Sequence, residues 1–203
     1  MIFSSREEII LYQVYSKRHY QDFWCGGKIN CLMETLEQLE KKPWWSYLGG
    51  DLQKLLSTSE FIYRVTEGWG ADLLGGKREF DDYSFVVFPA AKAYEGFLKK
   101  LFLDLKFITE EDYYGKHFRI GKALNPSLPK ELRHEGVYDK IVQRCQGDSK
   151  LANNLWEAWR LSRNLTFHWF PNEKNAITLS EAGERFEMII QAIDEAFEEC
   201  KPE

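Results

Sequence analysis

The segment Arg163-Asn164-Leu165-Thr166-Phe167-His168 places two side chains with different chemical abilities five residues apart. Arginine keeps its positive charge at any working pH, and its planar fork of N–H donors suits a phosphate that gains negative charge under attack. Histidine can take up or release a proton near pH 7. With the polar amide of Asn164 between them, these residues are candidates for binding and cleaving a phosphodiester.

The position of this pair on a helix limits how it can work. On an ideal α-helix, residues five apart are separated by about 140° around the axis and by about 7.5 Å along it. Arg163 and His168 would then flank a phosphate without touching each other. They form a working site if the helix is locally distorted, or if a second copy of the chain brings its own pair across a two-fold axis. The structural alternative is a surface arginine and a half-buried histidine beside Trp169.

The spacing of Arg163 and His168 resembles the Arg-x-x-x-x-His signature of HEPN-domain ribonucleases, in which the residue after the arginine is commonly polar, as Asn164 is. The resemblance covers about residues 83–200. It implies a small helical bundle with the signature on a late helix. In another HEPN branch a tyrosine two residues after the histidine receives an inactivating nucleotidyl group. Phe170 stands there instead, which favours control by a protein inhibitor.

A second stretch, Ala90–Lys100, resembles the Ala-Tyr-Glu-Gly helix of the RNase LS toxins, the RnlA and LsoA type. In that group the glutamate belongs to the active site, and the matching residue here is Glu95. Glu95 also lies at the edge of a predicted apolar stripe, where a carboxylate needs a partner. Arg163 is the natural candidate for that partner. The alternative is a glutamate that extends into solvent.

The resemblance implies an endoribonuclease toxin of a toxin–antitoxin or phage-defence system that needs no metal ion and no other cofactor. It also implies a homodimer, an RNA substrate and a protein antitoxin. In this hypothesis His168 acts as general acid or base, Arg163 and Asn164 hold the phosphate, and Glu95 orients Arg163 or influences the protonation of His168. The alternative function is a non-catalytic, dimeric HEPN-like binding module whose acidic surface meets a partner protein.

Basic and aromatic residues near the motif supply candidates for contacts with RNA. We expect Arg160 and Lys92 to bind it. Further cations that could follow the phosphates are Arg119, Lys122, Arg144 and Lys150. One of the nearby tryptophans could stack on a base, while at least two of the three are expected in the core. These tryptophans are Trp156, Trp159 and Trp169.

Hydrophobic periodicity predicts an all-α fold that positions these residues. The clearest stripe lies on a predicted helix over residues 90–105 and consists of Tyr94, Phe97, Leu98, Leu101, Phe102 and Leu105. The signature lies on a predicted helix over 150–169, closed by Pro171. The other predicted helices cover 29–42 (ended by Pro43), 50–57, 116–124 and 138–145, and a last one starts at Ser180 as N-cap and buries Phe186, Ile189, Ile190, Ile193 and Phe197. We regard residues 60–65 as strand or loop. Short connections after residue 83 favour an antiparallel bundle.

Glycines and charges between Thr66 and Asp82 predict a connector. We therefore divide the chain into an accessory region, 1–80, and a HEPN-like bundle, 83–203. The accessory region is predicted to be mainly helical and is a candidate for binding the antitoxin or shaping access of the substrate.

The composition restricts the class of protein. The 203 residues are 44% hydrophobic and 15% aromatic, which is enough for a globular core. A net charge of −5 disfavours a protein that coats nucleic acid, although an enzyme needs only a local basic patch. No apolar run approaches the roughly 20 residues that span a bilayer, and the start of the chain is charged. We expect no membrane association and a cytoplasmic location. The four cysteines, Cys25, Cys31, Cys145 and Cys200, are expected to be free thiols without a metal.

Overall fold

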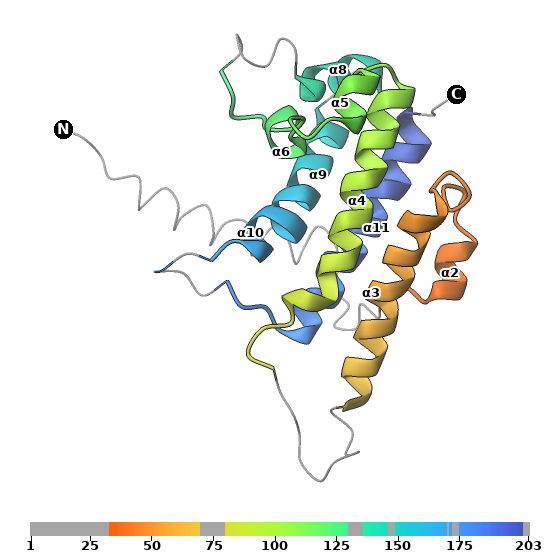
Figure 1. Ribbon diagram of the computed structural model, residues 1–203, viewed down its shortest axis with the longest axis vertical. Helices are drawn as coiled ribbons and strands as arrows, with labels where there is room; N and C mark the ends of the chain where they lie inside the picture. Colours follow the sequence, from red (N-terminus) through yellow and green to blue (C-terminus); the bar gives the residue numbers. More distant parts are fainter. Residues whose placement is uncertain are drawn as a thin grey trace, which may run out of the picture. The chain divides into compact units, whose positions relative to one another are not determined.

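The computed structural model describes residues 33–69, 80–129, 136–145, 149–169, 171 and 175–200. Every regular element in these ranges is a helix, which confirms the predicted all-α class (Figure 1). The more specific HEPN-like arrangement stays a prediction. None of the described helices combines the length and the apolar composition needed to cross a membrane.

Four helices pack side by side: α3 (Gly50–Trp69), α4 (Ser84–Asp104), α9 (Lys150–Trp159) and α11 (Leu179–Cys200). In Figure 1, α4 and α11 run in the same direction, with α3 on one side and α9 on the other, both running the opposite way. The shorter elements are α2 (Leu36–Glu40), α5 (Glu110–Tyr114), α6 (Ile120–Ala123), α8 (Val137–Arg144), the π-helical segment η1 (Arg160–Asn164) and α10 (Leu165–Phe167).

The core lies along α4 and α11, as the periodicity predicted. On α4 the predicted stripe is at most 1% exposed from Tyr94 to Phe102, whereas Leu105 is only half-buried. On α11 the predicted residues from Phe186 to Ile193 are fully buried and Phe197 is half-buried. Each fully buried side chain of this size contributes roughly 1.5–3 kcal/mol, so these two faces hold the bundle together.

The helix predicted over 50–57 is much longer than expected. It runs from Gly50 to Trp69, and residues 60–65 are helical, so the expectation of strand or loop was wrong. Tertiary contacts account for the difference: Leu56 and Tyr63 are buried, and the Ser59 hydroxyl donates to the backbone oxygen of Val86 on α4. Packing of a helix face commonly outweighs a weak local pattern.

Other helix starts also differ from the prediction, and the helix predicted over 116–124 covers only α6, Ile120–Ala123. α2 begins at Leu36 because Thr35 and Gln38 form a capping box, while residues 29–32 lie outside the described part. α4 begins at Ser84 and contains Pro89 in its N-terminal part. α11 begins after Thr178, whose hydroxyl accepts the Glu181 N–H at 3.2 Å while the Glu181 carboxylate accepts the Thr178 N–H at 2.8 Å, so Ser180 is not the cap.

Residues 33–69 belong to the same compact unit as the bundle, Met33–Glu203. The reason is the packing of α3 along α4. Over residues 33–69 the predicted accessory region is therefore not separate from the bundle. Its predicted role in binding a partner stays a prediction.

Cys145, just after α8, and Cys200, at the end of α11, form a disulfide with their Cα atoms 4.9 Å apart. The prediction of free thiols was wrong for this pair. The two residues are 55 apart in sequence, and only the fold brings the ends of α8 and α11 together. Cys25 and Cys31 lie outside the described residues.

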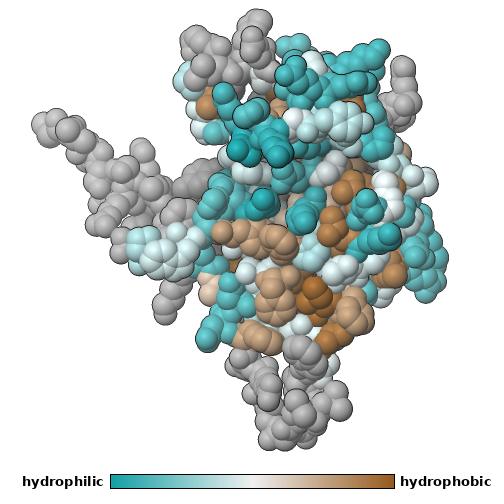
Figure 2. Space-filling model, viewed as in Figure 1, coloured by the Kyte–Doolittle hydropathy of each residue, from teal (hydrophilic) through white to brown (hydrophobic). Residues whose placement is uncertain are grey.

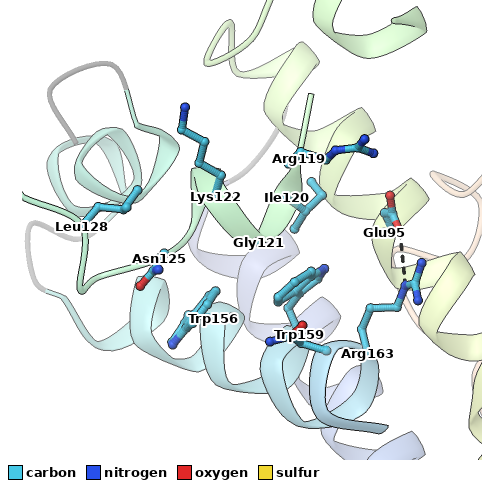
Figure 3. Close-up of a pocket in the computed structure, with 11 residues that line it drawn as sticks. Glu95, Arg119, Ile120, Gly121, Lys122, Asn125, Leu128, Trp156, Trp159 and Arg163 are labelled. Carbon is cyan, nitrogen blue, oxygen red and sulfur yellow. Dashed lines mark hydrogen bonds and ion pairs between the residues drawn. The ribbon is translucent and has the colours of Figure 1, made fainter. Parts of the chain in front are cut away.

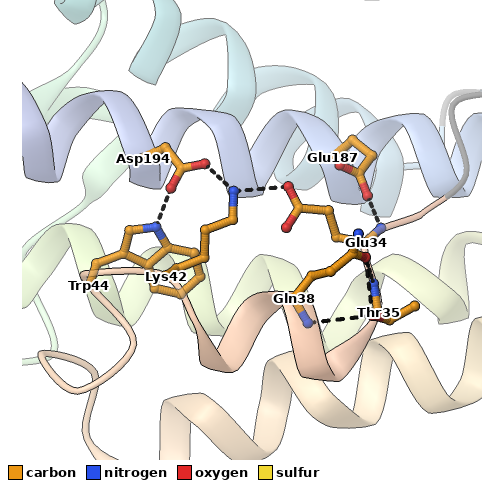
Figure 4. Close-up of polar contacts among 7 residues, drawn as sticks. All are labelled: Glu34, Thr35, Gln38, Lys42, Trp44, Glu187 and Asp194. Carbon is orange, nitrogen blue, oxygen red and sulfur yellow. Dashed lines mark hydrogen bonds and ion pairs between the residues drawn. The ribbon is translucent and has the colours of Figure 1, made fainter.

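A polar cluster joins the segment around α2 to α11 (Figure 4). The Lys42 ammonium lies 2.8 Å from Asp194 and 3.0 Å from Glu34, and the Glu34 N–H donates to the Glu187 carboxylate. The Trp44 indole N–H donates to Asp194. Burial raises the pKa of Glu187 from the usual 4.5 to about 7.

Glu187 is expected to make stability depend on pH. The Glu187 carboxyl group keeps its proton in the folded chain at a pH where the unfolded chain has released it. Its contribution to the free energy of unfolding is therefore complete below pH 4.5 and is lost as the pH rises through about 7. As the pH rises from 4.5 to about 7, we expect the free energy of unfolding of the wild type to fall by about 2–3 kcal/mol more than that of the Glu187→Gln variant. Urea unfolding at a series of pH values measures the difference. Glu198→Gln, an exposed change on the same helix, is the control, and a pH-independent difference for Glu187→Gln would contradict the assignment.

Candidate functional site

Arg163 lies in a distorted stretch of helix. The helix predicted over 150–169 consists of α9, the π-helical segment η1 and the short α10. In η1 the Leu165 N–H bonds to the Arg160 oxygen, an i→i+5 pattern that is rare and frequently found at functional sites. Side chains fill the loosened turn: the Thr166 hydroxyl (2.5 Å) and the Arg185 guanidinium both donate to the Leu161 oxygen.

The structure brings Arg163 and Glu95 together from η1 and α4, 68 positions apart in sequence. The Arg163 Nε atom lies 3.5 Å from Glu95 Oε2, and each side chain is 35% exposed (Figure 3). An ion pair this exposed contributes at most about 1 kcal/mol to stability. We therefore expect the ion pair to contribute little to folding, and either residue to be replaceable without a large loss of stability.

Glu95 and Arg163 close one end of a pocket of about 430 Å³. In Figure 3, Asn125 and Trp156 lie at the other end and Trp159 lies between the two ends. Arg119 and Lys122 are exposed cations in its wall. The lining residues are Glu95, Arg119, Ile120, Gly121, Lys122, Asn125, Leu128, Trp156, Trp159, Arg163 and Asn164.

Two stacked indoles form one side of this pocket. The rings of Trp156 and Trp159 have centroids 5.6 Å apart and planes inclined by 19°. The Nε1 atom of Trp159 is buried and has no hydrogen-bond partner among the described residues. Gly121 lies so close that a Cβ atom added there would be 2.2 Å from the Trp159 ring. A glycine is therefore required for this approach of α6 to α9.

Gly121→Ala is expected to destabilise the protein by about 1–3 kcal/mol, because the new methyl group displaces the Trp159 ring from its stack. Chemical denaturation gives the value. Gly68→Ala is a matched control: it lies near the end of α3 with no atom within 4 Å of the added Cβ, and we expect it to stabilise by about 0.4–1 kcal/mol. Equal effects of the two changes would show that the contact with Trp159 is unimportant.

Of the four predicted catalytic residues, three line the pocket and His168 does not. Helix α10 ends at Phe167, and His168 follows it in extended conformation (φ −102°, ψ 133°) with an exposed side chain. Its backbone oxygen accepts a hydrogen bond from the Asn175 amide at 2.9 Å. Because His168 lies just beyond the end of the helix, the separation expected for two residues five apart on one helix does not apply to Arg163 and His168.

The two cations predicted to bind RNA also lie outside the pocket lining. The Arg160 guanidinium donates to the Glu157 carboxylate at 2.9 Å and its side chain is only 16% exposed. Lys92 is exposed, with its ammonium 5.7 Å from the centre of the Phe88 ring. The cations that do line the pocket, Arg119 and Lys122, belong to the wider set noted in the sequence.

Sequence reasoning missed Gly121 and Asn125 as parts of the site. Their segment carries a signal for a turn, Asn125-Pro126, and we interpreted it only as a helix end. Asn125 Oδ1 accepts the Ser127 N–H at 2.9 Å, so the NH₂ group is the part of this side chain that can donate to a ligand. Nothing in the local pattern indicated that this turn faces α9.

Within the described ranges, no group of three or more His, Cys, Asp or Glu side chains is placed to hold a metal ion. Comparison of the chain with models of known protein families, with curated proteins and with solved structures finds no match.

Proposed function

We propose that the protein is a metal-independent endoribonuclease of the HEPN type, acting as the toxin of a toxin–antitoxin or phage-defence system. The observation that carries this proposal is the meeting of Glu95 and Arg163 in a cationic pocket. The two residues lie in separate stretches of sequence, each of which resembles the same superfamily. Support also comes from the π-helical distortion around Arg163, of a kind frequent at functional sites.

The reaction is a transesterification within the RNA strand. The ribose 2′-oxygen attacks the neighbouring phosphorus, the bond from phosphorus to the 5′-oxygen breaks, and the products carry a 2′,3′-cyclic phosphate and a 5′-hydroxyl. His168 accepts the 2′-hydroxyl proton or supplies one to the leaving oxygen. Arg163 and Asn164 bind the phosphate oxygens, whose charge increases during the attack. Glu95 holds the Arg163 guanidinium in place by the ion pair.

A homodimer explains how His168 acts although it lies outside the pocket of its own chain. In this proposal the His168 of one copy reaches the Arg163 of the other. An aromatic surface adjoins the motif: the Arg163 guanidinium lies 5.6 Å from the Phe167 ring, which is in edge contact with Phe88. Phe88 is 46% exposed, a large fraction for an apolar side chain of this size. This surface is where we place the second copy, and the antitoxin is proposed as a further protein partner.

The second candidate is a non-catalytic helical binding module. The observation that favours it is the extent of exposed apolar surface, which Figure 2 shows over α3 and α4. Phe61, Phe80, Phe85 and Phe88 are each at least 38% exposed. Contiguous apolar surface of this kind commonly marks a site of protein interaction. This candidate predicts a dimer or a protein complex without any RNA cleavage.

The test is incubation of the purified full chain with total RNA in the presence of EDTA. Metal-independent cleavage that leaves 2′,3′-cyclic phosphate ends supports the ribonuclease. Loss of cleavage on adding EDTA contradicts the metal-independent mechanism. Intact RNA with a folded protein of dimeric mass, measured by light scattering, supports the binding module instead.

A further inference from the structure

We propose that the end of the pocket formed by Trp156 and Asn125 is a nucleobase subsite, which receives one unpaired base of the RNA next to the phosphate at Arg163. This inference rests on the proposed function for the identity of the ligand as RNA. Such a subsite determines which form of RNA the protein binds and which residues recognise it.

The shape and chemistry of the pocket support this occupant. Its volume of about 430 Å³ lies in the range of roughly 300–1,000 Å³ typical of sites for small organic ligands. Trp156 is half-buried and offers an aromatic face within the pocket. Stacking on such a face is available to every base, since every base is a flat aromatic ring system.

Polar groups stand where the edge of a stacked base and its phosphates would lie. The Asn125 amide is beside Trp156, and its NH₂ group can donate to an acceptor on the base edge (Figure 3). Arg119 and Lys122 are exposed at the pocket wall, where they can bind the phosphates on either side. Among the described residues of the lining, Glu95 is the only carboxylate, and Arg163 is paired with it. In Figure 3, Lys122 lies on the side of Asn125 and Trp156 and Arg119 on the side of Glu95, so a further cation stands near each end of the pocket.

The subsite selects single strands over duplexes. In an RNA duplex the bases are stacked and paired, and their faces cannot reach a side chain within a pocket. A base must leave the stack before it can lie against Trp156. We therefore expect the protein to bind single-stranded RNA more tightly than duplex RNA of the same length and composition.

The experiment measures binding rather than cleavage. A fluorescein-labelled single-stranded RNA with 2′-O-methyl riboses, which cannot undergo the transesterification, is titrated with the full chain in EDTA and followed by fluorescence anisotropy. Trp156→Leu is expected to raise the dissociation constant roughly 5- to 150-fold, the measured range for loss of one aromatic stacking partner. Trp156→Phe should recover most of the affinity, because it keeps an aromatic face.

Trp45→Leu is the matched control. Like Trp156, Trp45 is half-buried and lies near a second indole, that of Trp44, with the ring centroids 6.1 Å apart. Unlike Trp156, it does not line the pocket. Its replacement should leave the dissociation constant unchanged. The Lys122 side chain is exposed, so Lys122→Gln should not affect folding. It should weaken binding and reduce the slope of log affinity against log salt by about 0.7, the value for one phosphate contact in a single strand.

The outcomes separate the subsite from the proposed function. An unchanged dissociation constant for folded Trp156→Leu, or for Lys122→Gln if the tryptophan variant does not fold, overturns the subsite. Equal affinity for duplex and single strand also overturns it. A third outcome is that the wild-type protein cleaves no RNA but binds it in a way that depends on Trp156. This result would support the subsite and contradict the proposed ribonuclease activity.

Discussion

Replacing Arg163 with alanine is expected to reduce RNA cleavage about a hundred- to a thousandfold, the typical cost of losing one charge-stabilising donor at a reaction centre. The physical reason is the position of the guanidinium at the end of the pocket, where it can bind a phosphate while Glu95 holds it. Rates of cleavage of a defined RNA in EDTA provide the measurement. Arg163→Lys should restore only part of the rate, because an ammonium keeps the charge but lacks the planar fork of donors.

Arg64→Ala is a close control for this change. The Arg64 side chain is 31% exposed and is also paired with a glutamate, Glu60, at 3.1 Å, but it lies on α3 away from the pocket. If both variants remain folded and lose activity equally, the effect is structural and Arg163 has no special role. We expect a change of at most about 1 kcal/mol in stability on loss of the ion pair at Arg163.

His168→Ala is expected to reduce cleavage about a hundred- to ten-thousandfold, the usual contribution of a group that transfers a proton in the transition state. Because the side chain is exposed after the end of α10, the unfolding free energy should change by less than about 0.5 kcal/mol. Both quantities are measured on the same preparation, by cleavage assays and by urea unfolding. A large loss of stability would favour a structural role for His168 and the binding module as function.

The exposed His117 provides the matched control, and His117→Ala should retain normal activity. The double variant, with Arg163 and His168 both replaced, should be little worse than the poorer single variant if both residues act on one step.

Mixing the two single variants tests whether the site is shared between copies. If Arg163 of one chain works with His168 of the other, a mixed dimer contains one intact site and regains part of the activity. If no activity returns from exchanged dimers, the two residues act within one chain.

Local pattern was sufficient to predict the helical class and the two central helices. The stripe on α4 recurs at three- and four-residue spacing over several turns, and such a stripe has a single buried face whatever it packs against. The length of α3 was not predictable in this way. The part of α3 beyond the predicted residues 50–57 is held by burial of Tyr63 and by the hydrogen bond from Ser59 to α4, which are contacts between distant segments.

The sequence by itself determined that the chain is helical and which residue types could act on a phosphodiester. It also indicated Glu95 as a partner for Arg163, and the two side chains meet. The tertiary structure alone decided the rest of the site. The π-helical turn depends on Arg185 reaching Leu161 from α11, and the pocket depends on the turn at Asn125 facing Trp156. The disulfide joins residues 55 apart. These features arise from contacts between segments far apart in the chain, and periodicity along one segment carries no information about them.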